Sequence, residues 1–295
     1  MLSRHAICSG HKAALYTLSG SHTPRHFLSA GGDGWITEWN FDAPETGRVV
    51  ANVDSKIFSL AIAPPEWPDQ MILAGNMLGG LHWVNRLRPT EGRNVLHHSK
   101  GIYDIIWLGN EVFTAGGDGM FTRWDAAQQR AVESFQLSNR SLRSIAYNPI
   151  TGIFAIGASD GNIYYIQKSD FSLLSQVAAH QFAVFSVLWS PDGQVLYSGG
   201  RDALLKSWVN FNTNTSSQPA HLYTINHLAL SPDGQYLASA SRDKSIKIWR
   251  ANDLSLLKVL ETFRDHGHLN SVNRLRWTHE GLLSCSDDRT ILIWA

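Results

Sequence analysis

The sequence has no excess of charge of either sign, no membrane-spanning run and no visible export signal. Its 295 residues carry 25 Lys and Arg against 25 Asp and Glu, so the formal net charge is zero. A balanced charge argues against bulk electrostatic attraction to nucleic acid or to a membrane, and leaves room for a local patch. No apolar run is long enough to cross a bilayer, and the N-terminus lacks an extended apolar segment preceded by positive charge. We therefore expect neither nucleic acid nor a membrane as a partner.

Motifs that signal metal sites are also missing. Neither HExxH nor a paired CxxC occurs. Of the thirteen histidines, only His97 and His98 are adjacent, and consecutive strand residues point to opposite faces, so this pair is poorly placed to bind one metal. The sequence predicts no metal site and no cofactor.

What the sequence does contain is one pattern repeated five times. A small hydroxyl residue is followed four positions later by Asp and six positions after that by Trp. The copies are SAGGDGWITEW (Ser29–Trp39), TAGGDGMFTRW (Thr114–Trp124), SGGRDALLKSW (Ser198–Trp208), SASRDKSIKIW (Ser239–Trp249) and SCSDDRTILIW (Ser284–Trp294). A repeat of 40–45 residues with a strand-like segment ending in Trp is typical of a β-propeller blade.

Two further segments keep the spacing with an aliphatic residue in place of Trp. They are LGGLHWV (Leu78–Val84), where Leu78 also replaces the Asp, and DGNIYYI (Asp160–Ile166). Tight SPDG turns and alternating apolar stretches such as Val184–Gly193 predict strands within each unit. The chain is therefore predicted to be all-β, with seven blades of four antiparallel strands in one domain over residues 1–295.

A histidine precedes each complete unit, and with it the chain resembles the WD40 repeat family. The resemblance implies buried hydrogen-bonded tetrads of His, Ser or Thr, Asp and Trp, whose role is structural, because buried polar groups are tolerated when all of them are paired. The implied tetrads are His11/Ser29/Asp33/Trp39, His98/Thr114/Asp118/Trp124, His180/Ser198/Asp202/Trp208, His221/Ser239/Asp243/Trp249 and His268/Ser284/Asp288/Trp294.

The last unit ends one strand short, at Trp294–Ala295, and the chain begins with a spare strand-like stretch, Ser3–Cys8. The family closes its ring by letting the N-terminal strand complete the final blade, which removes an unpaired edge. In that arrangement Cys8 and Cys285 lie two strands apart, about 10 Å, which is too far for a disulfide. Free buried thiols predict a cytoplasmic protein.

The same residues suggest chemistry that their recurrence argues against. His11, Ser29 and Asp33 resemble a hydrolase triad by residue type, but the set recurs in five units, whereas an active site is needed once. The GGDG segments at 31–34 and 116–119 are better explained as recurrent blade turns than as phosphate loops. We therefore predict a protein that is not an enzyme. The alternative is a small-molecule-binding or hydrolytic propeller that uses the central channel.

For partner binding, the resemblance implies a face around the central channel and a protein or peptide partner held by a scaffold. The residues expected to face outward there are Tyr16, Phe58, Tyr103, Arg143, Phe185, Arg201, Asn226, Arg242 and Asn273. Tyr and Arg dominate interface hot spots, although the aromatics could instead fill contacts between blades. The three arginines favour an acidic or phosphorylated peptide, unless Arg201 and Arg242 are simply solvated. We expect a monomeric propeller within a larger complex.

A second candidate surface comes from longer loops, among them PPEWPDQ (Pro64–Gln70). Trp67 in this loop is either an exposed anchor or a side chain that folds back onto its blade.

Overall fold

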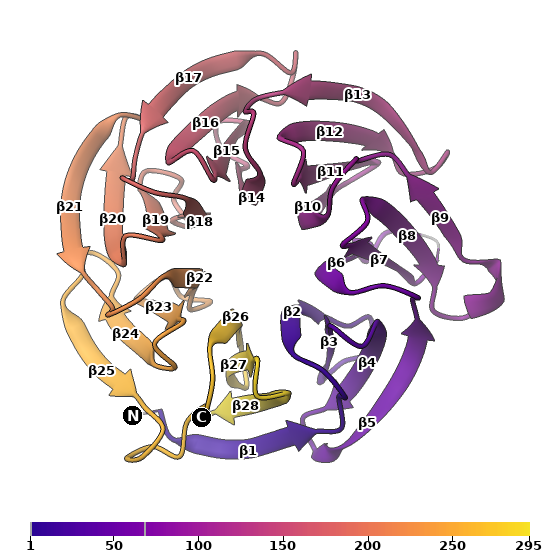
Figure 1. The fold of residues 1–295 in the computed structure, drawn as a ribbon, viewed down its shortest axis with the longest axis horizontal. Coiled ribbons are helices and arrows are strands. Elements are labelled where there is room, and N and C mark those ends of the chain that lie inside the picture. Colours follow the sequence, from indigo (N-terminus) through magenta and orange to yellow (C-terminus); the bar gives the residue numbers. More distant parts are fainter. Residues whose placement is uncertain (1, 68) are drawn as a thin grey trace. The chain divides into compact units, whose positions relative to one another are not determined.

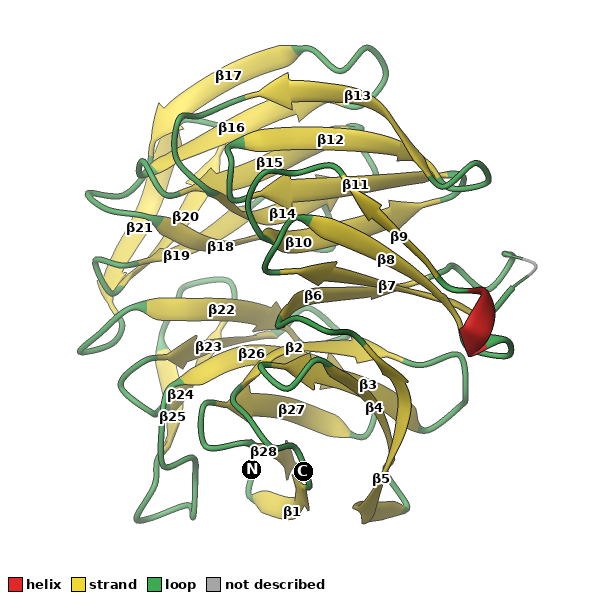
Figure 2. Cartoon of the chain, turned by 45° about the vertical axis from the view of Figure 1, so that its right-hand side comes forward, coloured by secondary structure: helices red, strands yellow, loops and turns green. Residues whose placement is uncertain are grey.

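The computed structural model describes residues 2–67 and 69–295. Strands form nearly all of the regular structure, and the helix that is described, Pro89–Glu91, is a single short 3-10 turn (Figure 2). The strands form seven four-stranded sheets (Figure 1). Every strand register that is described is antiparallel. The predicted all-β class and the seven four-stranded units are confirmed.

Consecutive strands form the first six sheets. The first sheet contains β2 (Leu15–Gly20), β3 (His26–Gly31), β4 (Trp35–Asn40) and β5 (Ala43–Asn52). The second contains β6 (Ile57–Ile62), β7 (Met71–Asn76), β8 (Gly80–Asn85) and β9 (Arg93–Leu96). The third contains β10 (Ile102–Leu108), β11 (Glu111–Gly116), β12 (Met120–Asp125) and β13 (Arg130–Gln136). The fourth sheet contains β14 (Leu142–Asn148), β15 (Ile153–Ala158), β16 (Asn162–Gln167) and β17 (Leu173–Ala178). The fifth contains β18 (Val184–Trp189), β19 (Leu196–Gly200), β20 (Leu204–Val209) and β21 (Thr213–Pro219). The sixth contains β22 (Ile225–Leu230), β23 (Tyr236–Ser241), β24 (Ile246–Arg250) and β25 (Leu256–Leu260).

The seventh sheet joins the two ends of the chain. Its strands are β26 (Val272–Thr278), β27 (Gly281–Ser286), β28 (Thr290–Trp294) and the N-terminal β1 (Arg4–Ser9), in the order β1-β28-β27-β26. Beyond the strand ends, Ser3 N donates to Ala295 O at 2.9 Å and Ala295 N donates to Ser3 O at 3.1 Å. The prediction that an N-terminal strand completes the last blade is confirmed, with the strand one residue later than expected.

Two compact units divide the chain. The first-half unit comprises Ala6–Leu142 and Cys285–Ile291, and the second-half unit comprises residues up to His5, Arg143–Ser284 and Leu292–Ala295. The expectation of one domain over residues 1–295 stays a prediction.

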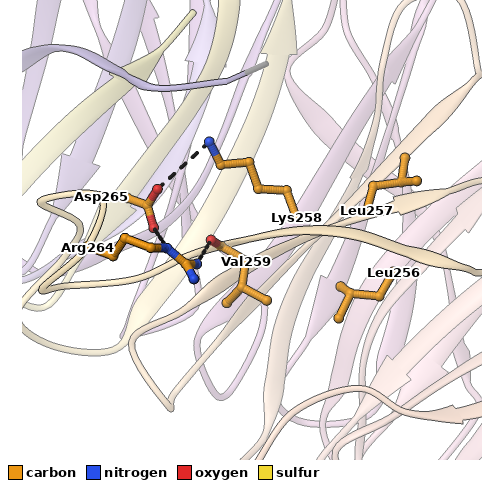
Figure 3. Close-up of a pocket in the computed structure, with 6 residues that line it drawn as sticks. All are labelled: Leu256, Leu257, Lys258, Val259, Arg264 and Asp265. Atoms are coloured by element: carbon orange, nitrogen blue, oxygen red, sulfur yellow. Dashed lines mark hydrogen bonds and ion pairs between the residues drawn. The ribbon is translucent and has the colours of Figure 1, made fainter.

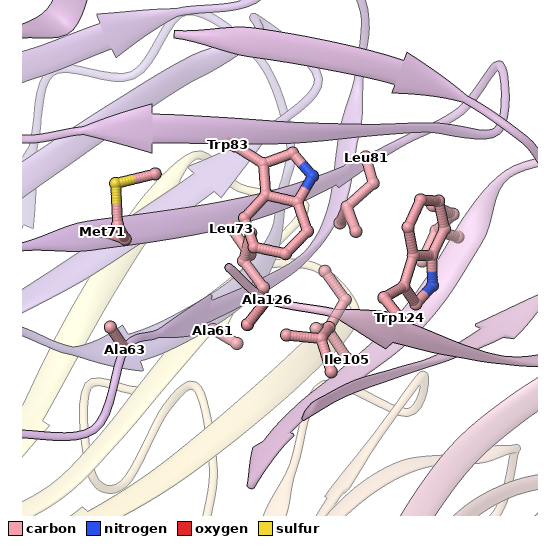
Figure 4. Packing of buried hydrophobic residues seen from close by; sticks show 11 residues of the cluster. Ala61, Ala63, Met71, Leu73, Leu81, Trp83, Ile105, Trp124 and Ala126 are labelled. Atoms are coloured by element: carbon pink, nitrogen blue, oxygen red, sulfur yellow. The ribbon is translucent and has the colours of Figure 1, made fainter. Parts of the chain in front are cut away.

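The second strand of each sheet is buried along almost its whole length. All six residues of β7 and all six of β15 are buried, whereas the fourth strands, such as β13, are largely exposed. A strand buried on both faces has no solvent side, so its side chains are apolar or small, or polar ones with hydrogen-bond partners inside the protein, such as Ser29 and Asn76. In the first-half unit, for example, Leu73 and Trp83 of the second sheet share one apolar cluster with Ile105 and Trp124 of the third (Figure 4).

Candidate functional site

A chain of hydrogen bonds crosses the first sheet at the predicted tetrad. Trp39 Nε1 donates to Ser29 Oγ at 2.8 Å, and Ser29 Oγ lies 2.8 Å from His11 Nε2. Because the serine oxygen accepts from the indole, its own hydrogen is free to go to the imidazole, and His11 Nδ1 then donates to Asp33 Oδ2 at 2.8 Å. Asp33 also accepts a hydrogen bond from Lys12 N at 2.9 Å. The network fastens the loop before β2 to β3, to β4 and to the turn between them.

Three other sheets contain the same chain of contacts, with distances of 2.7–3.0 Å. They are His98/Thr114/Asp118/Trp124, His180/Ser198/Asp202/Trp208 and His221/Ser239/Asp243/Trp249. In the seventh sheet His268 Nε2 and Trp294 Nε1 each lie 2.8 Å from Ser284 Oγ, while Asp288 Oδ1 accepts from Thr290 N at 3.0 Å.

Electrostatics favour the charged form of Asp118 in the network of the third sheet. Burial by itself raises the pKa of the Asp118 carboxyl, but the hydrogen bond and the field of His98, with backbone donors at Ser99 and Met120, outweigh burial and hold that pKa at about 2. In the four sheets where the whole chain of contacts is described, both ring nitrogens of the histidine are occupied within the sheet. Such a histidine has no nitrogen left for a metal or for proton transfer to a substrate.

The second and fourth sheets have apolar residues at the hydroxyl and tryptophan positions of the network, while the fourth keeps the aspartate, Asp160, which accepts from Tyr164 OH at 2.7 Å. In the first sheet Ser29 pairs with Thr37 in the strand register; in the second sheet the same place is taken by Ala74, paired with His82. Val84 occupies the place of the tryptophan, and Ala74 and Val84 belong to one buried apolar cluster. In the fourth sheet, Ile156 and Ile166 fill the corresponding two places and are buried.

The turn of the second sheet keeps an acceptor, but from an unexpected residue. Asn76 Oδ1 accepts from Leu78 N at 2.9 Å and from Gly80 N at 2.8 Å, and Asn76 Nδ2 lies 2.9 Å from His82 Nε2. The side chain that caps this turn therefore comes from two residues before the position that Leu78 occupies.

One further sequence pattern, GASDG at 157–161, matches the GxSxG form of hydrolase nucleophiles. The structure places it in a turn between two strands, β15 and β16, not between a strand and a helix. Ser159 Oγ accepts a hydrogen bond from Arg143 Nε at 2.8 Å. The strand-to-helix elbow that exposes such a nucleophile is not present at this serine.

The residues predicted to face a partner share a backbone feature that sequence reasoning missed. In the five sheets where the register of the first strand is described, that strand has an irregularity at its second residue. The residues concerned are Tyr16, Phe58, Tyr103, Phe185 and Asn226. A β-bulge changes the direction of a side chain relative to the regular pleat. All five side chains are half-buried.

In the first-half unit, three of these residues form a row of rings. Tyr16 and Phe58 meet edge to face with centroids 5.5 Å apart, and Phe58 and Tyr103 stack at 5.2 Å. The glycines beside the rings leave space for them: a Cβ at Gly101 would lie 3.0 Å from the Phe58 ring, and one at Gly117 would lie 2.9 Å from the Tyr103 ring. The rings therefore contact each other across three sheets while keeping part of their surface exposed.

In the second-half unit, the predicted residues divide into bonded and exposed groups. The Arg143 guanidinium, bonded to Ser159, also lies 5.1 Å from the centre of the Phe185 ring. Asn226 Nδ2 donates to Ser271 Oγ and to Val272 O, both at 2.9 Å.

Asn273 Oδ1 accepts from Ser271 Oγ at 3.0 Å, within the segment that enters its own sheet. Asn226, through its bonds to Ser271 and Val272, thus joins two neighbouring sheets. Arg201 and Arg242, by contrast, are exposed.

A set of exposed apolar side chains was absent from the prediction. All but one come one or two residues after a tetrad histidine, and the other lies in the loop that leads to His268. They are Phe182, Leu222, Tyr223, Leu269 and Phe263. The sequence does carry a signal for them, because HQF, HLY and HLN place bulky apolar residues in turns where the other units have polar ones.

The remaining candidates are packed inside the protein. The Trp67 ring meets the Trp107 ring edge to face at 5.3 Å and packs against a buried cluster, so this side chain folds back onto its sheet. Cys8 and Cys285 are both buried and form no disulfide, as predicted, and burial raises the pKa of the Cys8 thiol to about 12. Over residues 2–67 and 69–295, no group of three or more His, Cys, Asp or Glu side chains is arranged to hold a metal. Among the described helical residues, none belongs to a helix that could span a membrane.

Comparison with known proteins agrees with this architecture. The chain superposes on the crystal structure of the WD40 β-propeller domain of Doa1 with a TM-score of 0.86, covering 100% of this chain and 97% of that one at 17% sequence identity. The fold is thus a seven-bladed β-propeller. The family model described as "WD domain, G-beta repeat" matches residues 171–208, 212–250 and 257–295. This propeller therefore carries WD40 repeats.

Two curated relatives share part of the chain. The anaphase-promoting complex subunit cdh1 of Dictyostelium discoideum is 30% identical over 149 residues, which cover 48% of this chain and 20% of that protein. The probable cytosolic iron-sulfur protein assembly protein 1 of Candida glabrata is 27% identical over 168 residues, or 55% of this chain and 39% of that protein. The chain thus matches well under half the length of either relative.

Proposed function

We propose that this protein is a non-enzymatic scaffold that binds a protein or peptide partner through residues at the starts of its first strands. The observation that carries the proposal is the repeated bulge, which directs Tyr16, Phe58, Tyr103 and Phe185 out of the regular pleat. Half-exposed aromatic rings on a rigid sheet are suitable hot spots, because little conformational entropy is lost when they are covered.

Two further observations support this proposal over an enzymatic one. The histidines of the complete networks have both nitrogens engaged with their own sheets. One relative is by name a subunit of a complex and another an assembly protein. A scaffold needs no catalytic group, and activity would come from what it binds.

Exposed basic side chains in the second-half unit favour an acidic or phosphorylated partner. Arg201 and Arg242 precede the tetrad aspartates of neighbouring sheets and are exposed. Neither side chain has an ion pair with another described residue, so both guanidinium groups can bind carboxylate or phosphate oxygens.

The test is affinity capture from the source cell with wild type and an Arg201→Ala/Arg242→Ala variant. Arg93→Ala/Arg130→Ala is the matched control, since these two exposed arginines lie on the outer strands β9 and β13. We expect the first variant to lose a partner that the control retains. Equal capture by all three proteins would contradict the role of these arginines.

A second pair of substitutions tests the aromatic part of the surface. Tyr103→Ala and Phe185→Ala should abolish capture while changing the midpoint of urea unfolding little, because both side chains are only half-buried. If these variants unfold at much lower urea concentration, the rings serve the core and this part of the proposal fails.

A further inference from the structure

We propose that the loops before β18, β22 and β26 form an apolar docking surface for an acidic, amphipathic segment of a partner protein. The inference rests on the proposed scaffold function and assigns it to one part of the chain. The side chains that define this docking surface are Phe182, Leu222, Tyr223, Phe263 and Leu269.

The large apolar side chains of the docking surface are strongly exposed to solvent. Leu222 is 86% exposed, Phe263 94%, Leu269 64% and Tyr223 61%. Single exposed leucines are normal on protein surfaces, but a gathering of large apolar side chains marks an interaction site. The equivalent loops before β2, β6, β10 and β14 instead contain the polar or charged residues Lys12, Asp54, Lys56, Lys100 and Arg140.

The three loops emerge at the same edge because the first strands lie side by side with their starts together. Leu228 N, the fourth residue of β22, donates to Ser186 Oγ, the third residue of β18, at 3.0 Å, so the two strands lie side by side in similar register. The hydrogen bonds from Asn226 to Ser271 and Val272 join the start of β22 to the start of β26. The loops that lead into these strands are therefore neighbours.

These loops are held rigidly by their backbones. In the loop before β22, Leu222 N donates to the Asp243 carboxylate at 3.0 Å, and the carbonyl oxygen of Tyr223 accepts from Ser241 Oγ at 3.2 Å. Apolar side chains on a fixed backbone lose less entropy on binding than those on a mobile loop.

The loop before β26 has an insertion that is also fixed. Asp265 N and Gly267 N both donate to Glu261 O at 3.1 Å, and Asp265 Oδ2 accepts from Glu261 N at 3.1 Å. Figure 3 shows the base of this insertion, where Arg264 bonds the carbonyl of Val259 and reaches the Asp265 carboxylate. Phe263, between these anchored residues, has almost its whole side chain in solvent.

The positive charge of two exposed arginines indicates which kind of partner the docking surface binds. Arg201 and Arg242 are exposed beside the docking surface, and the Arg201 guanidinium lies 5.9 Å from the centre of the Phe182 ring. The carboxylates of Asp202 and Asp243 are bonded to the tetrad histidines, with side chains only 7% and 8% exposed. The exposed arginines are thus not neutralised by these aspartates, and a segment that carries carboxylates next to apolar side chains complements the surface.

The experiment selects short random peptides displayed on phage against the whole chain. We expect enriched peptides to combine Leu, Phe or Trp with Asp or Glu. Their affinity, measured by fluorescence polarisation, should fall at least about tenfold for a Leu222→Ser/Phe263→Ser variant. The control is Leu96→Ser/Ile150→Ser, which changes side chains that are 70% and 67% exposed in other parts of the chain, and it should bind like wild type.

Three outcomes would overturn this inference. Peptides that bind the Leu222→Ser/Phe263→Ser variant unchanged but lose affinity for Tyr103→Ala would leave the scaffold function standing and remove the docking surface. Self-association of wild type that the variant abolishes would make this surface an interface between two copies. Binding to vesicles of phosphatidylcholine and phosphatidylserine that the variant loses would make it a lipid contact. The absence of any enriched peptide would count against both proposals.

Discussion

Replacing Asp118 by Asn should lower the free energy of unfolding by about 2–3 kcal/mol at neutral pH, and this cost should shrink in acid. The folded protein holds the pKa of Asp118 at about 2, against an ordinary 3.8. One pH unit of pKa difference corresponds to about 1.4 kcal/mol, which gives the stated magnitude. The side chain is 11% exposed, so solvent screening reduces the value little.

The direction of this pH dependence follows from the protonation state of Asp118 that the folded protein favours. Because the folded pKa is lower than the unfolded one, the carboxylate stabilises the folded state fully above the unfolded pKa of 3.8 and loses this effect as the pH falls through about 2. At pH 3 roughly half of the contribution, about 1 kcal/mol, should remain.

The assay is urea unfolding followed by tryptophan fluorescence, for wild type and Asp118→Asn at about pH 7, 4 and 3, with equal m-values required at each pH. Asp125→Asn is the control. Asp125 belongs to the same sheet and accepts a hydrogen bond from Gln128 N at 2.9 Å, with no ion pair to another described residue. A difference between wild type and Asp118→Asn that stays constant from about pH 7 to 3 would refute the reasoning, because it would show that the ionised form is not what the network stabilises.

Four other changes test the stability of the fold by urea unfolding. Ser198→Ala should cost about 2–3 kcal/mol, because it leaves buried indole and imidazole nitrogens without a partner. Ala74→Ser should cost about 1–2 kcal/mol, because it places a hydroxyl in an apolar cluster. A stabilising effect of either substitution would contradict the role given to the networks. Glu38→Gln should cost about 3 kcal/mol, since the Arg86 guanidinium, now 2.8 Å from the carboxylate, would remain largely buried without its counter-charge, and an unchanged midpoint would show that the pair contributes nothing. Removing residues 2–9 deletes β1 and opens the edge of β28, so we expect the cooperative transition to be lost; retention of a wild-type midpoint would show that the seventh sheet is stable with three strands.

Much of the fold could be predicted because a fixed spacing repeats. The distance from Ser29 to Asp33 and then to Trp39 matches a strand, a tight turn and a second strand, and the structure has β3 and β4 in those places. The degenerate units could be placed by the same spacing, and Val84 does occupy the position of the tryptophan in the strand register. Asn76 could not be predicted, since it caps its turn from outside the repeated positions.

The candidate site was harder to predict because its geometry depends on deviations from the regular pattern. An alternating sequence such as that around Tyr16 indicates a strand but does not show where one extra residue interrupts the pairing. Asn226 is a residue type typical of surfaces, yet its side chain bonds to Ser271 and Val272 of the neighbouring sheet. Whether a leucine such as Leu222 is buried or exposed depends on which chain segments cover it, and spacing along the sequence does not report that.

The two sheets without a tetrad show how this fold separates stability from binding. A buried polar network is stable when every member is paired, and an apolar set is stable when no member is polar, whereas a mixture leaves unpaired groups. The structure contains both solutions, with Ser29 in the network of the first sheet and Ala74 in the apolar cluster of the second. Either solution supports the same four strands, so the interior does not dictate which residues follow in the loops. Loop residues such as Leu222 and Lys12, which occupy equivalent places after a histidine, can then differ in character at little cost to the fold. For this reason we look for the partner's chemistry in the loops before the first strands rather than in the repeated residues.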